Sequence, residues 1–110
     1  MKPAQAELLA AAMDRLWKQH LPELEDRVAV LEAAATAAGA GTISDQLREE
    51  AHFAAHKLAG VLGTFGLAEG TDLAREAERF FSGSDEEGWI SQERISQVPI
   101  QLRALMAARK

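Results

Sequence analysis

Apolar residues recur at helical spacing in five stretches of the chain, and polar residues separate these stretches. The first stretch covers residues 3–19 and begins with Pro3, which suits the first turn of a helix. Pro22 opens the second stretch, which continues to about residue 38 and is followed by a Gly-Ala-Gly segment that ends it. The pattern therefore predicts two amphipathic helices within the first 40 residues.

Three further helices are predicted in the rest of the chain. Their approximate bounds are residues 44–65, 67–81 and 91–108. Ser44 and Asp45 are the candidate N-caps of the first of them. The last one contains Pro99, which predicts either a kink or a short helix before a longer one. A short solvated connection is expected at residues 86–88.

Helices that are joined by short loops and have one apolar side each predict an all-α fold. Alanine is abundant and tyrosine is absent, which favours helices over strands. We expect one domain over residues 1–110. Within it, residues 21–110 should form an antiparallel up-down four-helix bundle, preceded by an additional N-terminal helix at 1–20.

The composition excludes several classes of function. The net charge is −5, so the chain lacks the basic surface that nucleic-acid binding needs, and an acidic surface does not seek anionic membranes. The absence of cysteine excludes disulfides, thiolate metal sites and thiol catalysis. No apolar run approaches the roughly 20 residues of a membrane span, and the first residues lack a signal-peptide pattern. A cytoplasmic protein is expected.

The predicted helix at 44–65 carries the candidate chemistry. On a helical wheel at about 100° per residue its apolar residues gather on one side. These residues are Leu47, Ala51, Ala54, Leu58, Val61, Leu62 and Phe65. His56 falls directly opposite, with Glu49, His52, Gly60 and Gly63 as its neighbours on the outer side. The wheel therefore predicts that the His56 side chain faces solvent.

Gly60 and Gly63 on this outer side require an explanation, because glycine inside a helix costs about 1 kcal/mol relative to alanine. Bare backbone would let another protein come close to the imidazole, and close packing of helices is the alternative. A neutral imidazole is a nucleophile that can form covalent intermediates. The glycine-containing segment 60–66 lacks the Lys-Ser/Thr ending of an ATP-binding loop, so a phosphoryl donor would have to be another protein.

Residues 55–67, Ala-His-Lys-Leu-Ala-Gly-Val-Leu-Gly-Thr-Phe-Gly-Leu, resemble the signature of the histidine-containing phosphotransfer (HPt) domain family. That signature is His-x-Leu-Lys-Gly, followed six residues later by another glycine. The next helix of the family usually contains a Leu-Glu pair, and Ala77-Glu78 lies at that distance here. The resemblance extends over about residues 21–106 and is most specific around His56.

The resemblance implies a four-helix bundle in which His56 accepts a phosphoryl group from the aspartate of a receiver domain, or from a hybrid histidine kinase, and passes it to another receiver. It implies a phosphocarrier without catalytic turnover of its own, and Mg²⁺ on the receiver rather than a cofactor on this chain. Gly60 would give the receiver room, and Glu78 would orient the imidazole by a hydrogen bond to one nitrogen. An ordinary solvated carboxylate is the alternative for Glu78. Lys57, Gly63, His52 and Glu49 complete the expected docking face.

One position departs from the family. The family usually has lysine three residues after the histidine, where this chain has Ala59. Lys57 is basic but lies about 100° around the helix from His56. The departure puts the usual electrostatic help for the phosphorylated form in doubt.

Two alternatives come from other classes of function. A degenerate HPt-like bundle would dock a receiver or kinase without carrying phosphate, and Ala59 favours this reading. His52 and His56 are spaced i, i+4, as in some metal sites, with Glu49 as a conceivable third ligand, which would suit a metal-dependent enzyme. The motif lacks the glutamate of the His-Glu-x-x-His pattern, so we expect no metal and no cofactor on this chain. We also expect the chain to be a monomer.

Overall fold

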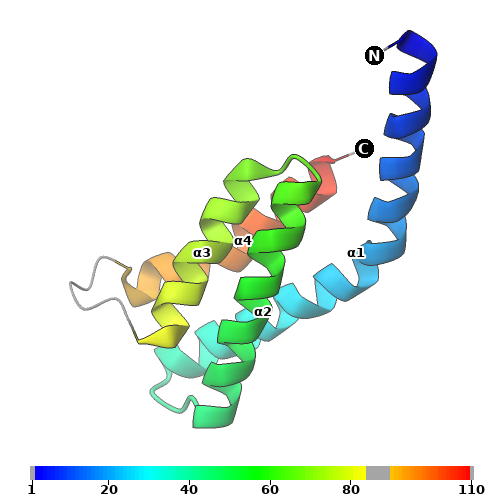
Figure 1. Cartoon of the computed structure of the whole chain (residues 1–110). Helices are drawn as coiled ribbons and strands as arrows, with labels where there is room; N and C mark the ends of the chain where they lie inside the picture. The colour runs from blue at the N-terminus through cyan, green and yellow to red at the C-terminus, as the bar shows by residue number, and fades with distance from the viewer. Residues whose placement is uncertain (1, 84–89, 110) are drawn as a thin grey trace.

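Four helices arranged as a bundle make up this computed structural model, which describes residues 2–83 and 90–109 (Figure 1). They are α1 (Pro3–Gly39), α2 (Asp45–Thr64), α3 (Ala68–Ser82) and α4 (Gln92–Ala108). Contacts link α1 to α2, α2 to α3, α3 to α4 and α4 back to α1. The predicted all-α bundle is confirmed. The connection expected at 86–88 lies outside the described residues.

The prediction of two separate helices in the first 40 residues is wrong, because α1 continues through Pro22. A proline inside a helix removes one backbone hydrogen bond and bends the helix without always ending it. Figure 1 shows this bend, which divides α1 into a projecting N-terminal part and a part within the bundle. The additional N-terminal helix expected at 1–20 is therefore the first arm of the bent helix α1.

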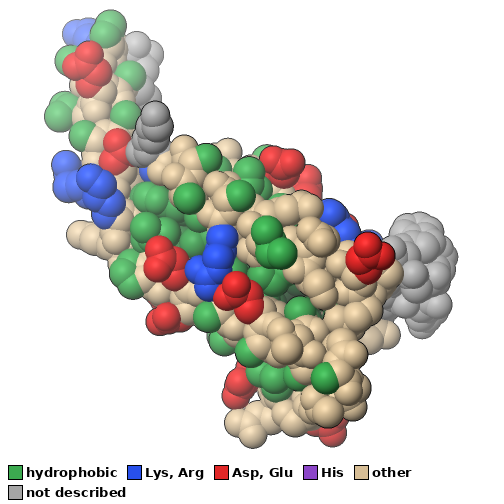
Figure 2. All heavy atoms as spheres, turned by 180° about the vertical axis from the view of Figure 1, so that it is seen from behind, with side chains coloured by type: hydrophobic (Ala, Val, Ile, Leu, Met, Phe, Trp, Pro, Cys, Tyr) green, Lys and Arg blue, Asp and Glu red, His purple; other side chains and the backbone are tan. Residues whose placement is uncertain are grey.

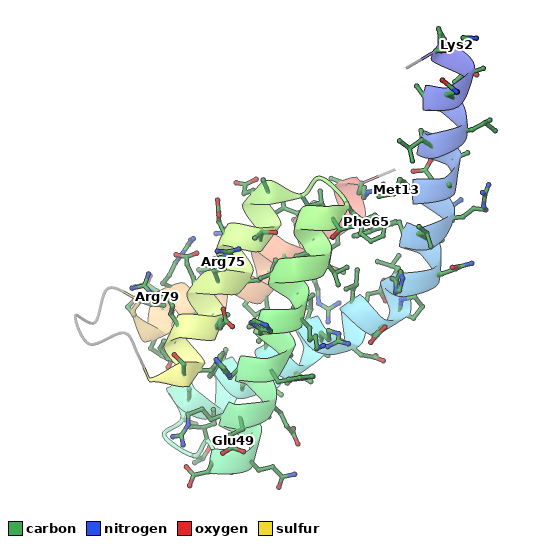
Figure 3. The ribbon with its side chains drawn as sticks, in the orientation of Figure 1. Lys2, Met13, Glu49, Phe65, Arg75 and Arg79 are labelled. Carbon is green, nitrogen blue, oxygen red and sulfur yellow. The ribbon has the colours of Figure 1, made fainter. Side chains whose placement is uncertain are left out.

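Contacts near the bend hold the projecting part of α1 against the bundle. Trp17 is buried, and its ring meets Phe65 edge to face with centroids 5.2 Å apart. The Arg109 guanidinium lies over both rings, and it also pairs with Asp14 at 3.3 Å. Figure 3 shows Phe65 at the end of α2 that faces this part of α1. Burial of Trp17 against the partly buried Phe65 explains why the helix continues past its proline.

The ends of α2 follow the predicted signals. The Ser44 hydroxyl accepts a hydrogen bond from the Leu47 N–H at 3.0 Å, so Ser44 rather than Asp45 is the N-cap. Gly66 adopts a positive φ of 78°, which turns the chain towards α3.

Helix α4 is continuous, and its Pro99 is buried. The alternative of a short helix before a longer one is therefore wrong.

The core consists mainly of aliphatic side chains, with Trp17 and Phe81 as its buried aromatic residues. The largest fully buried ones are Leu24, Val28, Leu31, Leu58, Leu62, Ile95, Val98 and Leu102. Over residues 2–83 and 90–109 no polar or charged side chain is buried, so the candidate chemistry lies on the surface of the bundle. None of the four helices, as far as they are described, is long and apolar enough to cross a membrane.

Candidate phosphotransfer site on helix α2

His56 lies on the outer side of α2, where its side chain is 68% exposed. Ala55 and Leu58, on either side of it in the sequence, are fully buried. The exposure predicted from the helical wheel is confirmed. Figure 2 shows the bundle from behind, and no histidine is visible there among the side chains that it colours. The imidazole therefore stands on one face of the molecule, open to a partner.

A carboxylate on α3 holds the His56 ring. His56 Nδ1 lies 2.5 Å from Glu78 Oε2, and the Glu78 side chain is only 25% exposed. A carboxylate accepts hydrogen bonds, so Nδ1 carries the proton that it donates to Glu78. The other nitrogen, Nε2, then keeps its lone pair and is the nucleophilic atom of the ring.

The same carboxylate lies beside the second predicted histidine. His52 Nε2 is 3.9 Å from Glu78 Oε2, and the His52 side chain is 43% exposed. The structure thus brings His52, His56 and Glu78 together, with Glu78 between the two imidazoles. Sequence reasoning grouped the two histidines by their spacing, whereas only the family resemblance pointed to Glu78.

Close contact between α2 and α3 sets the position of Glu78. The Thr71 hydroxyl donates a hydrogen bond to the Ala59 carbonyl at 2.8 Å. A Cβ added to Gly63 would lie 3.2 Å from that hydroxyl, and a Cβ added to Gly70 would lie 3.1 Å from the Leu62 side chain. Glycine at 63 and 70 therefore lets the two helices approach each other. For Gly63, the alternative of close helix packing applies.

Gly60 differs from Gly63 in its surroundings. It is exposed, and a Cβ added there would meet no atom within 4 Å. Packing inside the bundle therefore does not explain this glycine. The open space beside it is what a docking partner would need, which agrees with the expectation for Gly60 without testing it.

Lys57 packs against an aromatic side chain one turn earlier on α2. Its ammonium lies 5.2 Å from the centre of the Phe53 ring. On the α1 side, the Glu23 carboxyl has a lowered pKa, chiefly because Arg27 hydrogen-bonds it, and Lys57 adds a smaller favourable charge. Phe53 is 57% exposed and was not among the predicted site residues. Its signal in the sequence is an aromatic residue about 60° from His56 on the outer side of the wheel.

Glu49 lies two turns before His56, near the N-terminal end of α2 (Figure 3). Together with His52 it lines a shallow pocket against Phe81 and Ser82 of α3. Across the described residues, no group of three or more histidine, cysteine, aspartate or glutamate side chains is placed to hold a metal ion. Glu49, His52 and His56 thus do not form the conceivable three-ligand site.

Fold and site together define a class of protein: an all-helical bundle that displays one histidine, held by a carboxylate of the neighbouring helix, to a partner. The Hpt domain family model matches residues 5–109, so the chain belongs to the Hpt domain family. Members of this family carry phosphoryl groups in two-component phosphorelays and interact with receiver domains and kinases. The resemblance seen in the sequence is confirmed.

The chain is also similar to Protein RcaC of Microchaete diplosiphon, with 29% identity over 75 residues. The aligned region covers 68% of this chain and 12% of that protein, so the chain spans only a small part of its relative. No solved structure matches the chain.

Proposed function

We propose that His56 is the phosphoacceptor of a phosphorelay intermediate. The observation that carries this proposal is the contact between Glu78 and Nδ1 of a largely exposed ring. Such a contact leaves Nε2 with its lone pair directed to solvent. An exposed nucleophile beside the open backbone of Gly60 suits transfer between two proteins.

The transfer follows from this geometry. His56 Nε2 attacks the phosphorus of an aspartyl phosphate on a receiver domain. The N–P bond forms, the acyl O–P bond breaks, and the receiver aspartate leaves as a carboxylate. The ring gains positive charge as it attacks, and Glu78 stabilises that charge through the Nδ1–H. The reverse step delivers the phosphoryl group to the aspartate of a second receiver, so this chain is a carrier without turnover of its own.

The receiver is expected to supply the Mg²⁺, as the family resemblance implies, and this chain is expected to bind no cofactor. A receiver domain or a hybrid histidine kinase is the proposed partner. The residues of this chain contribute the nucleophile, its orientation and an accessible surface. His52, Gly60 and Phe53 are exposed or half-exposed around His56 and form the proposed docking face.

Labelling with a phosphorylated receiver tests the proposal. A receiver domain charged with radioactive acetyl phosphate should transfer label to this chain, and the label should be stable to base and labile to acid. His56→Gln should abolish the label. His20→Gln is the matched control, since His20 is a half-exposed histidine on α1, outside the proposed docking face, and it should keep the label. Glu78→Ala should label more slowly, because the ring loses its orienting partner.

Two outcomes would overturn the proposal. Equal labelling of the wild type and His56→Gln would exclude His56 as the phosphoacceptor. Binding of the phosphorylated receiver without any label on the chain would favour the alternative of a docking module that carries no phosphate.

A further inference from the structure

Helix α2 has no lysine at the position that the family uses beside its histidine. The position where the family has lysine is occupied by Ala59, whose side chain is 7% exposed. Lys57 lies over the Phe53 ring and near Glu23, on the α1 side of the helix. Glu78 holds the His56 ring from the opposite side, that of α3. On the α3 side of the ring, a compensating positive charge would therefore come from another helix.

The contacts of α3 show which of its side chains face α2. Thr71 and Glu78 both reach α2, through Ala59 and His56. Glu76 faces α4 instead, where Arg94 pairs with it at 2.7 Å. At about 100° per residue, the side of α3 that faces α2 is thus separated from the side that faces α4 by about 140°.

Arg75 lies on the edge of α3 that borders α2. It is about 40° from Thr71 and about 60° from Glu78 on the helical wheel, one turn from each. Along the helix it therefore stands between the contact to Ala59 and the contact to His56. Figure 3 shows Arg75 near the middle of α3, with Arg79 nearer to the C-terminal end of that helix. Packed helix axes lie about 8–10 Å apart, a gap that a long arginine side chain spans.

The Arg75 side chain is exposed, and no other described side chain holds its guanidinium. Within residues 2–83 and 90–109 it makes no ion pair and no hydrogen bond, although Glu78 is only one turn away. Arg94 and Arg103 are each held by a glutamate. A guanidinium presents several N–H donors in a fixed fork that matches the oxygens of a phosphoryl group.

We propose that Arg75 binds the phosphoryl group on His56 and takes the place of the lysine that the family has at position 59. The inference rests on the proposed function of His56. Because Glu78 holds Nδ1, the phosphoryl group is on Nε2, outside the contact between the ring and that carboxylate. Arg75 reaches across from α3 and donates hydrogen bonds to the phosphoryl oxygens. This positive charge favours the dianionic form of the phosphoryl group and lowers its pKa.

Titration of the phosphorylated protein by ³¹P NMR tests this role. Phosphoramidate, a small donor that needs no partner protein, is used to phosphorylate the full chain. The resonance that His56→Gln removes is assigned to phospho-His56. Arg75→Ala should raise the pKa of this phosphoryl group by about half a unit, as expected for one exposed charge pair. Arg75→Lys should restore most of the difference, and Arg75→Glu should raise the pKa further.

Arg48→Ala is the matched control, because Arg48 is an exposed arginine at the start of α2 that pairs with Asp45. It should leave the phosphoryl pKa unchanged. An unchanged pKa in Arg75→Ala, or a shift in Lys57→Ala as large as the one expected for Arg75, would overturn the role of Arg75 while His56 remained the phosphoacceptor. A wild-type chain without a resonance that depends on His56 would overturn both proposals.

Discussion

The inner and outer sides of α2 differ in what their side chains contribute. The inner side carries only alanine and leucine among its buried side chains, and Leu58 and Leu62 are completely enclosed. The outer side carries two histidines, an exposed phenylalanine and the open backbone of Gly60. One turn of the helix therefore holds both a residue that stabilises the bundle and the nucleophile that we propose for transfer.

This difference suggests that stability and phosphotransfer can be changed separately along the same helix. Burial of apolar area stabilises the inner side, whereas exposure is required of the nucleophile on the outer side. Glu78 and Thr71 belong to neither side of α2, because they lie on α3 and contact α2 between its inner and outer sides. Substitutions on the two sides of α2, and one away from it, test how complete the separation is.

The largest effect is expected at Leu58. Leu58→Ala removes a fully buried side chain and should lower the free energy of unfolding by about 2–5 kcal/mol, measured by urea denaturation. Phe53→Ala is the matched control on the outer side, and a change within about 0.5 kcal/mol is expected because the ring is 57% exposed. A similar loss in both variants would break the comparison.

The inner side was predictable because its signal is periodic. Leu47, Ala51, Leu58 and Leu62 follow one another at helical spacing, and the same spacing placed His56 opposite to them. The contact between His56 and Glu78 carries no such signal. It depends on how closely α2 and α3 pack, and residues 22 positions apart can be related only through the fold or through a known family.

The two arms of α1 show a second limit. Pro22 is a valid signal for the start of a helix and also for a bend within one, and local sequence does not separate the two. Burial of Trp17 against Phe65 decides between them, and Phe65 lies 48 positions further along the chain. Tertiary packing thus set the outcome where the local signal was ambiguous.

A smaller effect is expected at the two glycines. Gly60→Ala should stabilise the protein by about 0.5–1 kcal/mol, because the added methyl group meets no neighbour and helix propensity improves. Gly63→Ala should stabilise less, since its Cβ would lie 3.2 Å from the Thr71 hydroxyl that bonds the Ala59 carbonyl. Urea denaturation of both variants measures the difference.

A double mutant shows whether Thr71 causes that difference. In a Thr71→Ala background, Gly63→Ala should gain as much stability as Gly60→Ala does in the wild type.

Gly60→Leu tests the proposed docking role of Gly60. Transfer from a phosphorylated receiver should slow, while labelling by phosphoramidate should not, because the small donor needs no open surface. Equal slowing with both donors would contradict the docking role of Gly60.

The smallest effect is expected away from α2, where Glu32 of α1 pairs with Arg103 of α4. The hydrogen bond from Arg103 lowers the pKa of the Glu32 carboxyl below its ordinary value of about 4.5, against the opposing effect of burial. Because the pKa is lower in the folded state, the pair stabilises the fold at pH values above about 4.5. The contribution disappears as the pH falls below 4.5 and through the folded-state pKa.

Glu32→Gln should therefore unfold more easily than the wild type at pH 7, by about 0.2–1 kcal/mol, because both partners are more than a third exposed and solvent screens them. The difference should vanish once the pH is below the folded-state pKa, as followed by urea denaturation from pH 7 to pH 3. Glu7→Gln, at an exposed position on the projecting part of α1, should show no such pH-dependent difference. His56 labelling at pH 7 should be the same in both variants, since Glu32 pairs with α4 and Glu7 is exposed on the projecting part of α1. A change in labelling by Glu32→Gln would show that the bundle couples its α1–α4 contact to the outer side of α2, and the separation between stability and transfer would then fail.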